Sequence, residues 1–386
     1  MNQTDQNFPM VAKTLSGLED ILADELTRLG AKKVKPAIRS VEFEGDTKTL
    51  YKANIWCRTT TRILKPILKF HAIDGEQLYA KIIRINWSNY FNVNKTIAVD
   101  ALSTYSKLEN TLFIAQKTKD AIVDQFREKF NKRPSVDTKN PQIKINIHII
   151  KNEVTVALDS SGDPLSKRGY RLEKGQAPLS EILAAGIIYL TDWDKSSSFI
   201  DPMCGSGTFV IEAALMARNI APGLIRKAYA FQNWNDYDAK LYDNICHTAR
   251  KVVIKSVPIQ IVGSDIDGIA IKDAVANARR AGVDRDIRFE RNPMDKQTVP
   301  PPPGIAILNP PYGERMKQDD ISLLYKSIGD CFKQSYSGYK AFILSGNMKA
   351  IKTVGLRASQ KIKLYNGPLE CRLLRYEMYE GTKKQK

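Results

Sequence analysis

Residues 197–209 read Ser-Ser-Phe-Ile-Asp-Pro-Met-Cys-Gly-Ser-Gly-Thr-Phe. A short apolar strand here enters a glycine-rich turn led by Asp201, and an apolar helix follows over 209–218. This order places backbone N–H groups and a helix N-terminus at the carboxyl edge of a sheet, where nucleotides bind in open α/β folds. The turn is not a Walker loop, because no Gly-Lys-Ser/Thr follows. It also lacks the dinucleotide fingerprint, because Val210 stands in place of the third glycine.

Two further apolar strands lead to acidic residues. Residues 259–264 run into Asp265 and Asp267, and the strand that begins at Ile287 leads to Asp295. Strands that alternate with helices form a parallel sheet, whose carboxyl ends meet at one edge. We therefore expect Asp265 to accept hydrogen bonds from the ribose hydroxyls of a nucleoside, and Asp295 to accept one from the adenine amino group. Asp267 is expected to cap the helix that follows over 269–281.

The most specific element is the strand over 305–308 and the tetrapeptide after it, Asn309-Pro310-Pro311-Tyr312. An exocyclic amine of a base is a poor nucleophile, because its lone pair is delocalised into the ring. The Asn309 side chain and the Pro310 carbonyl offer two acceptors for the amine hydrogens, and Tyr312 offers a ring that stacks on the base. The tetrapeptide therefore predicts group transfer to a base amine, driven by in-line positioning, without a metal or a strong base.

The first 160 residues have a different organisation. One helix is predicted over 18–29, before Gly30, and a longer amphipathic helix with a basic outer face over 110–130. Residues 143–149 alternate as a strand, with 153–158 as the hairpin partner. Short strands and helices in a small basic module suggest an RNA-binding platform. A turn-rich basic linker over 162–175 separates this module from the strands described above.

Composition limits the classes of partner. The 386 residues include 59 Lys plus Arg and 42 Asp plus Glu, a net charge of +17, and both 1–160 and 161–386 are basic. This favours a nucleic acid over a merely soluble surface. The five cysteines are widely spaced and only three histidines occur, so neither disulfides nor a metal site is expected. No run of 18 apolar residues and no signal peptide is found, so a cytoplasmic protein without membrane contact is expected.

With these residues the chain resembles the bacterial ribosomal RNA guanine-N2 methyltransferases of the large subunit. The matching segments are 117–124, 167–171, 177–179, 183–186, 201–208, 221–223, 309–315 and 367–371. The resemblance implies an α/β, Rossmann-like class I methyltransferase domain preceded by ferredoxin-like and THUMP α+β domains. The expected divisions are 1–60 for the ferredoxin-like region, 61–160 for the THUMP domain, and 161–386 for the linker and the methyltransferase domain.

The resemblance also implies the cofactor, S-adenosylmethionine, and a set of site residues. The target base would contact Asn309, Pro310, Pro311 and Tyr312. The cofactor would contact Ala177, Pro178, Leu179, Asp201, Cys204, Gly205, Gly207, Asp265 and Asp295. Lys117 and Lys119 in the THUMP helix, with Arg168 and Arg171 in the linker, are expected to contact RNA.

Several alternatives remain open. A related THUMP-containing group methylates guanine-N2 in transfer RNA, and the Gly-Glu-Arg sequence after Tyr312 favours 23S ribosomal RNA over it. Adenine-N6 methylation of DNA would use the same tetrapeptide, but the RNA-type module argues against it. A non-catalytic RNA-binding assembly factor is disfavoured by the intact Asn309 and glycine turn. Some family members continue into a second methyltransferase domain, whereas this chain ends at Lys386, so only guanine-N2 activity is expected.

Overall fold

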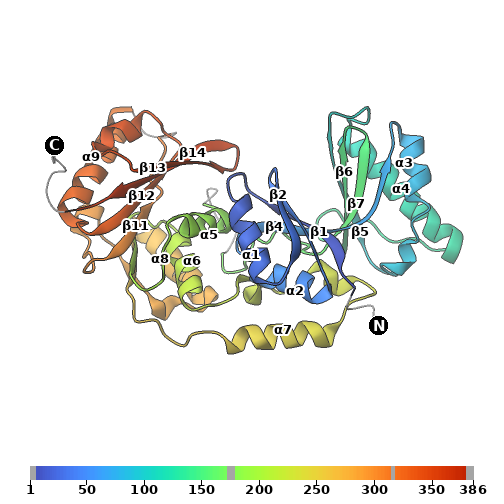
Figure 1. Ribbon diagram of the computed structural model, residues 1–386, viewed down its shortest axis with the longest axis horizontal. Coiled ribbons are helices and arrows are strands. Elements are labelled where there is room, and N and C mark those ends of the chain that lie inside the picture. Colours follow the sequence, from blue (N-terminus) through green and yellow to red (C-terminus); the bar gives the residue numbers. More distant parts are fainter. Residues whose placement is uncertain (1–5, 172–178, 314–317, 380–386) are drawn as a thin grey trace. The chain divides into compact units, whose positions relative to one another are not determined.

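The computed structural model describes residues 6–171, 179–313 and 318–379 (Figure 1). The chain forms two compact units, each built from separate segments. The first contains residues up to Thr14, Leu22–Leu165 and Arg226–Thr248, and the second contains Leu15–Ile21, Ser166–Ile225 and the chain from Ala249 onward.

The first unit is built on one seven-stranded sheet with the order β2-β3-β1-β4-β7-β6-β5. Strand β4 runs from Thr60 to His71, so the ferredoxin-like and THUMP regions expected on either side of residue 60 share a sheet. The elements are β1 (Phe8–Thr14), α1 (Glu19–Arg28), β2 (Lys32–Ala37), β3 (Ser40–Gly45), α2 (Thr47–Trp56), β4, α3 (Gly75–Ile82), η2 (Trp87–Asn89), β5 (Ile97–Thr104), α4 (Thr111–Phe130), β6 (Ile143–Ile150), β7 (Glu153–Asp159), η4 (Ala230–Asn233) and most of α7 (Ala239–Lys251).

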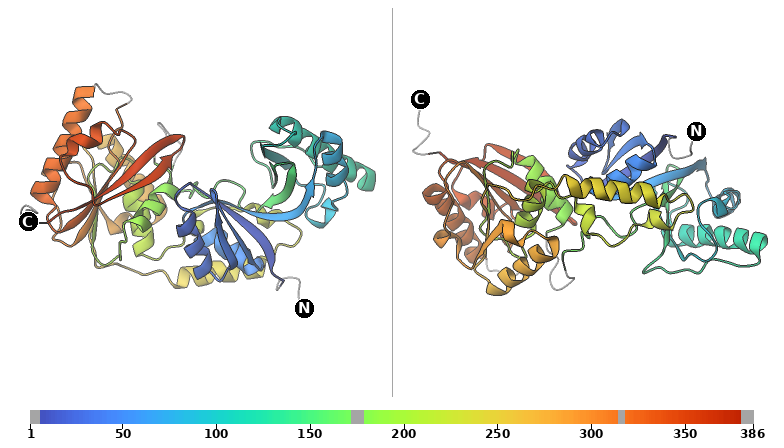
Figure 2. Two further views of the ribbon diagram at one scale, coloured as in Figure 1. Left: turned by 45° about the horizontal axis from the view of Figure 1, so that its top comes forward. Right: turned by 90° about the horizontal axis from the view of Figure 1, so that it is seen from below.

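The sheet of the first unit buries one face beneath helices. In β6 the alternate residues Ile143, Ile145, Ile147 and Ile149 are buried, as the period-two sequence pattern predicts. Helices α3 and α4 lie together on one side of β5, β6 and β7 (Figures 1 and 2). The predicted helix over 110–130 is confirmed, and the Asn110 side chain caps it by accepting a hydrogen bond from the Phe113 N–H.

The segment Arg226–Thr248 belongs to the first unit, although it follows the glycine turn in sequence. Aromatic packing holds it there. The ring of Tyr51 stacks on that of Phe231 with centroids 4.3 Å apart, and Tyr237 and Tyr242 complete the cluster. The sequence-based division had placed this segment with the methyltransferase domain, because βαβ alternation does not show where an insertion packs.

The second unit is a doubly covered sheet with the order β10-β9-β8-β11-β12-β14-β13. The five strands from β10 to β12 in this order pair in parallel. Strand β14 is antiparallel to both of its neighbours, β12 and β13. Its strands are β8 (Ser198–Asp201), β9 (Ile261–Ser264), β10 (Ile287–Glu290), β11 (Gly304–Leu308), β12 (Tyr339–Ser345), β13 (Gln360–Asn366) and β14 (Leu369–Glu377). Its helices are α5 (Glu181–Leu190), α6 (Thr208–Ala217), η3 (Pro222–Ile225), α8 (Gly268–Ala281), η5 (Asp284–Asp286), η6 (Met294–Lys296), α9 (Gln318–Ser335) and η7 (Ala350–Val354). The last residues of α7, from Ala249 onward, also belong to this unit.

The chain order creates a switch point in this sheet. From β8 the chain adds β9 and then β10 on one side, and it returns to place β11 and β12 on the other side. Helices α5, α6 and α8 pack in one core with Phe199 and Ile307, whereas α9 packs in the opposite core with Ile200 and Leu308. Because connections diverge between β8 and β11, a crevice for a ligand is expected at their carboxyl ends. These are the ends that carry the glycine turn and Asn309.

No helix within the described ranges is long and apolar enough to cross a bilayer. The same residues contain no group of three or more His, Cys, Asp and Glu side chains arranged to hold a metal ion.

Candidate active site at the sheet edge

The glycine turn joins β8 to α6 and is tied to the neighbouring strand. The Cys204 N–H donates to the Ser264 carbonyl at 2.8 Å, and the Gly207 N–H donates to the Cys204 carbonyl at 2.8 Å. Gly205 and Gly207 both have left-handed backbones, with φ of +53° and +84°. A Cβ on Gly207 would lie 3.1 Å from Ala274 Cβ, whereas one on Gly205 would meet no atom within 4 Å. Gly207 thus permits close packing on α8, and Gly205 borders open space.

Two carboxylates shape this turn. Asp265 accepts the Gly205 N–H with Oδ2 at 2.9 Å and the Asp267 N–H with Oδ1 at 2.9 Å. Asp201 is 2% exposed, and its Oδ1 accepts the Met203 N–H at 3.1 Å. Burial raises the pKa of Asp201 well above its usual range, and the nearby charge of Asp265 adds to the shift. Burial likewise raises the pKa of the Cys204 thiol, which argues against a nucleophilic thiolate.

The open space at Gly205 and the acids around it fit a nucleoside with a cationic side chain. Asp265 follows β9 directly, and Asp295 is exposed in η6 after β10, so both lie beyond the carboxyl ends of their strands. Asp267 accepts the Ile269 N–H at 2.8 Å, which confirms it as the cap of α8. Ile266, which the sequence reasoning did not single out, follows Asp265 and is 70% exposed, so it adds an exposed apolar side chain next to that carboxylate.

Changing Gly207 to alanine is expected to weaken cofactor binding at least about tenfold and to destabilise the fold by about 1–3 kcal/mol. The new Cβ would both strain the backbone and press on Ala274. Gly282→Ala is the matched control, because Gly282 also has a positive φ, +74°, but has open space around it and ends α8. Calorimetry with S-adenosylhomocysteine should show weaker binding only for the first variant. Equal affinities would remove the turn from the cofactor site.

Asn309 is held by the tyrosine of its own tetrapeptide. Asn309 follows β11 directly, and the Tyr312 hydroxyl donates to Asn309 Oδ1 at 2.6 Å. The Cys371 Sγ lies 3.7 Å from the same hydroxyl, and burial raises the pKa of Tyr312. Pro310 is buried and Pro311 is exposed. The Tyr312 hydroxyl therefore fixes the orientation of the Asn309 side-chain amide. It uses one lone pair of Asn309 Oδ1 and leaves the other for a second hydrogen-bond donor.

Three residues that support the tetrapeptide were not found from the sequence. Asn347 Nδ2 donates to the Tyr312 carbonyl at 2.9 Å, and the Tyr325 hydroxyl donates to the Pro311 carbonyl at 3.4 Å. Gly346 leaves room for this packing, because a Cβ there would lie 3.2 Å from the Tyr312 ring and 2.7 Å from Leu369. The only sequence signal was their location at the end of the apolar strand β12 and in the helix α9.

Arg168 does not lie where a contact with RNA requires it. Its side chain is 2% exposed, and its Nε lies 3.5 Å from Oε1 of Glu212, which is itself completely buried. The Tyr170 hydroxyl donates to the same carboxylate at 3.2 Å. The expectation of an RNA contact by Arg168 is therefore wrong, because its charge neutralises a buried glutamate of α6.

Arg171 is also directed into the protein. Its guanidinium donates to the Leu179 carbonyl at 3.3 Å and to the Thr208 hydroxyl, and it pairs with Glu181 at 3.3 Å. It therefore connects the end of the Ala-Pro-Leu stretch to the first residue of α6. Leu179 itself is buried, and Ala177 and Pro178 lie outside the described residues.

The two lysines predicted on α4 already have acidic partners. Lys117 Nζ lies 2.7 Å from Glu76, and Lys119 pairs with Asp120. Their role in RNA binding stays a prediction.

Comparisons with known protein families agree with this architecture. The model of the RMKL-like methyltransferase domain matches residues 168–375, that of the THUMP domain matches 73–159, and that of the RlmL ferredoxin-like domain matches 9–64. The ribosomal RNA large subunit methyltransferase K/L of Syntrophotalea carbinolica is 41% identical over 97% of this chain. This chain spans only 54% of that relative.

Two further matches extend over whole proteins. A Synechocystis sp. protein provisionally named as an RNA methyltransferase is 39% identical, with 96% of this chain and 97% of that protein aligned. A crystal structure of a provisionally named methyltransferase with S-adenosylhomocysteine bound is 32% identical. It has a TM-score of 0.88 and covers 98% of this chain and 100% of its own.

Proposed function

Because the chain belongs to the RMKL-like methyltransferase family, we propose that it methylates the exocyclic N2 amine of a guanine in 23S ribosomal RNA. S-adenosylmethionine is its cofactor, and when bound it supplies an electrophilic methyl group. The Rossmann-like fold and the THUMP domain belong to the same chain.

One observation carries the proposal: the pairing of β8 with β11. These strands are parallel neighbours, with Ala306 opposite Ile200, so the glycine turn and Asn309 follow at the same edge of the sheet. A donor on the Gly205 side and an amine at Asn309 would face each other across the switch point. Asp201 and Asp265 would then hold the donor, with Asp295 farther along the edge, and Leu179 would border it.

Asn309 and the Pro310 carbonyl are proposed to act on the base amine. The Asn309 amide oxygen accepts one N2 hydrogen and the Pro310 carbonyl accepts the other, which favours a pyramidal, nucleophilic nitrogen. Tyr312 contributes in two ways, because its hydroxyl fixes the Asn309 oxygen and its ring offers a face to the base. Pro311 stiffens the connection between them. Precise positioning of the reacting atoms can lower such a barrier by about 7–11 kcal/mol.

RNA as the substrate class is supported by the first unit and by charge. The THUMP match covers most of its second half, and the whole chain carries a net charge of +17. The name of the Syntrophotalea relative indicates large-subunit ribosomal RNA. A guanine within folded RNA must be unstacked to reach the sheet edge, which costs a few kcal/mol. Phosphate contacts by the first unit would offset this cost.

The decisive assay is methyl transfer from isotopically labelled S-adenosylmethionine to purified substrates. 23S ribosomal RNA from cells that lack this gene, total transfer RNA and duplex DNA should be incubated separately, then digested to nucleosides for mass spectrometry. We expect N2-methylguanosine in the ribosomal RNA alone. Label in transfer RNA would instead favour the THUMP-containing group that methylates guanine-N2 in transfer RNA, and N6-methyladenine in DNA would contradict the proposed chemistry. No transfer, with cofactor bound, would favour the assembly factor.

A further inference from the structure

The first unit has a groove on the sheet face that the helices leave open. The groove has a volume of about 700 Å³ and is lined by residues of β1, β2, β3, β4, β6 and β7. Its side chains alternate with the buried isoleucines of β6, so Asn146 and His148 point into it. His148 and Lys69 both pair with Thr155 of β7, which places the three in one row across the strands.

Lys13 of β1 is the unusual residue of this groove. It is half-buried, and burial lowers the pKa of its ammonium group, with Arg39 adding to the shift and Glu42 opposing it. Among the residues that the structure describes, neither Lys13 nor Lys69 forms an ion pair. The positive charge of Lys13 also acts on His148, whose pKa is lowered first by burial and then by that charge. A partly desolvated cation that makes no direct ion pair is costly, and an anionic ligand in contact with it would lower that cost.

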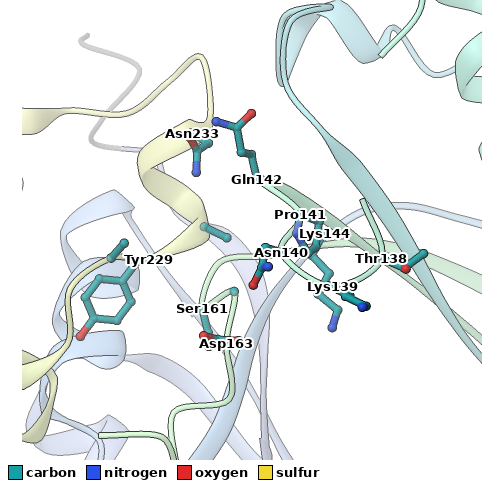
Figure 3. Close-up of a pocket in the computed structure, with 13 residues that line it drawn as sticks. Thr138, Lys139, Asn140, Pro141, Gln142, Lys144, Ser161, Asp163, Tyr229 and Asn233 are labelled. Carbon is teal, nitrogen blue, oxygen red and sulfur yellow. The ribbon is translucent and has the colours of Figure 1, made fainter. Parts of the chain in front are cut away.

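A second depression lies on the same face of β6. It has a volume of about 210 Å³ and lies between the loop before β6 and the segment 228–233 (Figure 3). Lys139 and Asn140 line it from the loop, Lys144 from β6, and Asn233 from the facing segment. Lys144 and His148 are four residues apart on one strand face, which is about 13 Å at roughly 3.3 Å per residue. One phosphate cannot span that distance, whereas an extended chain of phosphates can.

We propose that the helix-free sheet face of the first unit binds an unpaired RNA strand, with phosphates at Lys13 and in the Lys139–Lys144 depression. Asn146, Thr155 and Ser40 on the groove floor offer donors and acceptors to base edges, and Val11 and Pro66 offer apolar contact. An unpaired strand fits this role better than an A-form duplex, because the major groove of a duplex is too deep and narrow for side chains to reach its base edges, whereas unpaired bases expose theirs. The inference rests on the proposed function, since it assigns the RNA strand to a specific surface.

This surface competes with the basic face of α4 as the RNA contact. Lys117 and Lys119 on α4 already pair with carboxylates, so RNA would have to displace those partners. Lys13, Lys69 and Lys139 make no ion pair within the described ranges, whereas Lys144 pairs with Asp100 at 2.8 Å, so a phosphate there would compete with that carboxylate. Two carboxylates, Glu42 and Glu153, also line the groove. The negative charge of Glu42 partly offsets the positive charge of Lys13, as its effect on the pKa of Lys13 shows. Removing Glu42 should therefore strengthen RNA binding.

The test uses the full chain with saturating S-adenosylhomocysteine and a labelled 12-nucleotide single-stranded RNA of mixed sequence, followed by fluorescence anisotropy. Lys13→Gln should weaken binding about fivefold, and the slope of log affinity against log salt should become shallower by about 0.7. Glu42→Gln should tighten binding. Lys81→Gln, an exposed position on α3 of the helical side, should leave affinity and slope unchanged. Thermal unfolding of each variant checks that the fold is kept.

The possible results of this experiment test the sheet-face inference, the alternative contact on α4 and the proposed function separately. If the wild type binds and neither Lys13→Gln nor Glu42→Gln changes affinity, the sheet surface is overturned while the proposed methylation stands. Loss of binding with Lys117→Gln or Lys119→Gln, and none with Lys13→Gln, would return the contact to α4. If the wild type does not bind the 12-nucleotide RNA while it binds S-adenosylhomocysteine, the sheet-face inference is overturned, and the methyl-transfer assay decides the proposed substrate separately. Opposite shifts for Lys13→Gln and Glu42→Gln support the inference, because a mere loss of stability cannot tighten binding.

Discussion

Asn309→Ala is expected to lower the rate of methyl transfer at least 10²–10³-fold, the usual cost of removing one preorganised polar partner of a transition state. Cofactor affinity should stay within about twofold, because the amide contacts Tyr312 and the proposed base rather than the glycine turn. The rate is measured by transfer of labelled methyl groups at saturating RNA, and cofactor affinity by calorimetry. The expected pattern is a loss in kcat without a loss in binding.

Asn244→Ala is the matched control for this variant. Asn244 is exposed on α7, and its backbone carbonyl, not its side chain, accepts a hydrogen bond from the Thr248 hydroxyl at 2.8 Å. The same chemical change there should alter neither the rate nor the affinity. If Asn309→Ala instead lost rate and cofactor affinity together, Asn309 would be part of the cofactor pocket. The proposed role in activating the amine would then be abandoned.

Arg168→Met is expected to destabilise the fold by about 3–5 kcal/mol, because it leaves the buried Glu212 carboxylate without its cation. The Tyr170 hydroxyl remains as a donor but carries no charge. Each kcal/mol lowers the unfolding temperature of a domain of this size by roughly 2–4 °C. Calorimetric unfolding should therefore show a fall of at least about 6 °C in the transition of the second unit.

The double variant Arg168→Met with Glu212→Leu separates this account from simple loss of packing. Removing both charges of a buried pair is often neutral, so the double variant should regain most of the lost stability. Arg279→Met is the surface control, since its side chain is 75% exposed and lies 3.9 Å from Asp284. An Arg168→Met protein of normal stability and weakened RNA affinity would instead restore the original expectation of an RNA contact.

The local elements were accessible from the sequence because each is set by neighbours along the chain. The turn at Gly205 and Gly207 requires left-handed backbones, and glycine adopts them most easily. The Asp267 cap of α8 needs only a carboxylate at the right position, and β6 needs only an alternating pattern. The resemblance to a known family extended these local signals to the domain order, which the family models bear out.

The linker 167–171 shows why the prediction of an RNA contact by Arg168 failed. Its sequence, Lys-Arg-Gly-Tyr-Arg, has the composition of a basic surface loop. The partners that bury it, Glu212 of α6 for Arg168 and Thr208 for Arg171, lie 44 and 37 residues farther along the chain. Likewise, nothing local to 226–248 indicates that its aromatic rings pack on Tyr51.

The sequence by itself determined the strand-end motifs, the cap and the alternation of strands, because short-range backbone sterics and periodicity specify them. Only the tertiary structure decided that β8 and β11 are neighbours, so that the glycine turn and Asn309 follow adjacent strands, that Arg168 is buried, and that Lys13 faces an open groove. Those outcomes depend on strand order and on pairing between distant residues. The free energy of burying or exposing a charge is set by such distant partners, and a linear pattern does not contain it.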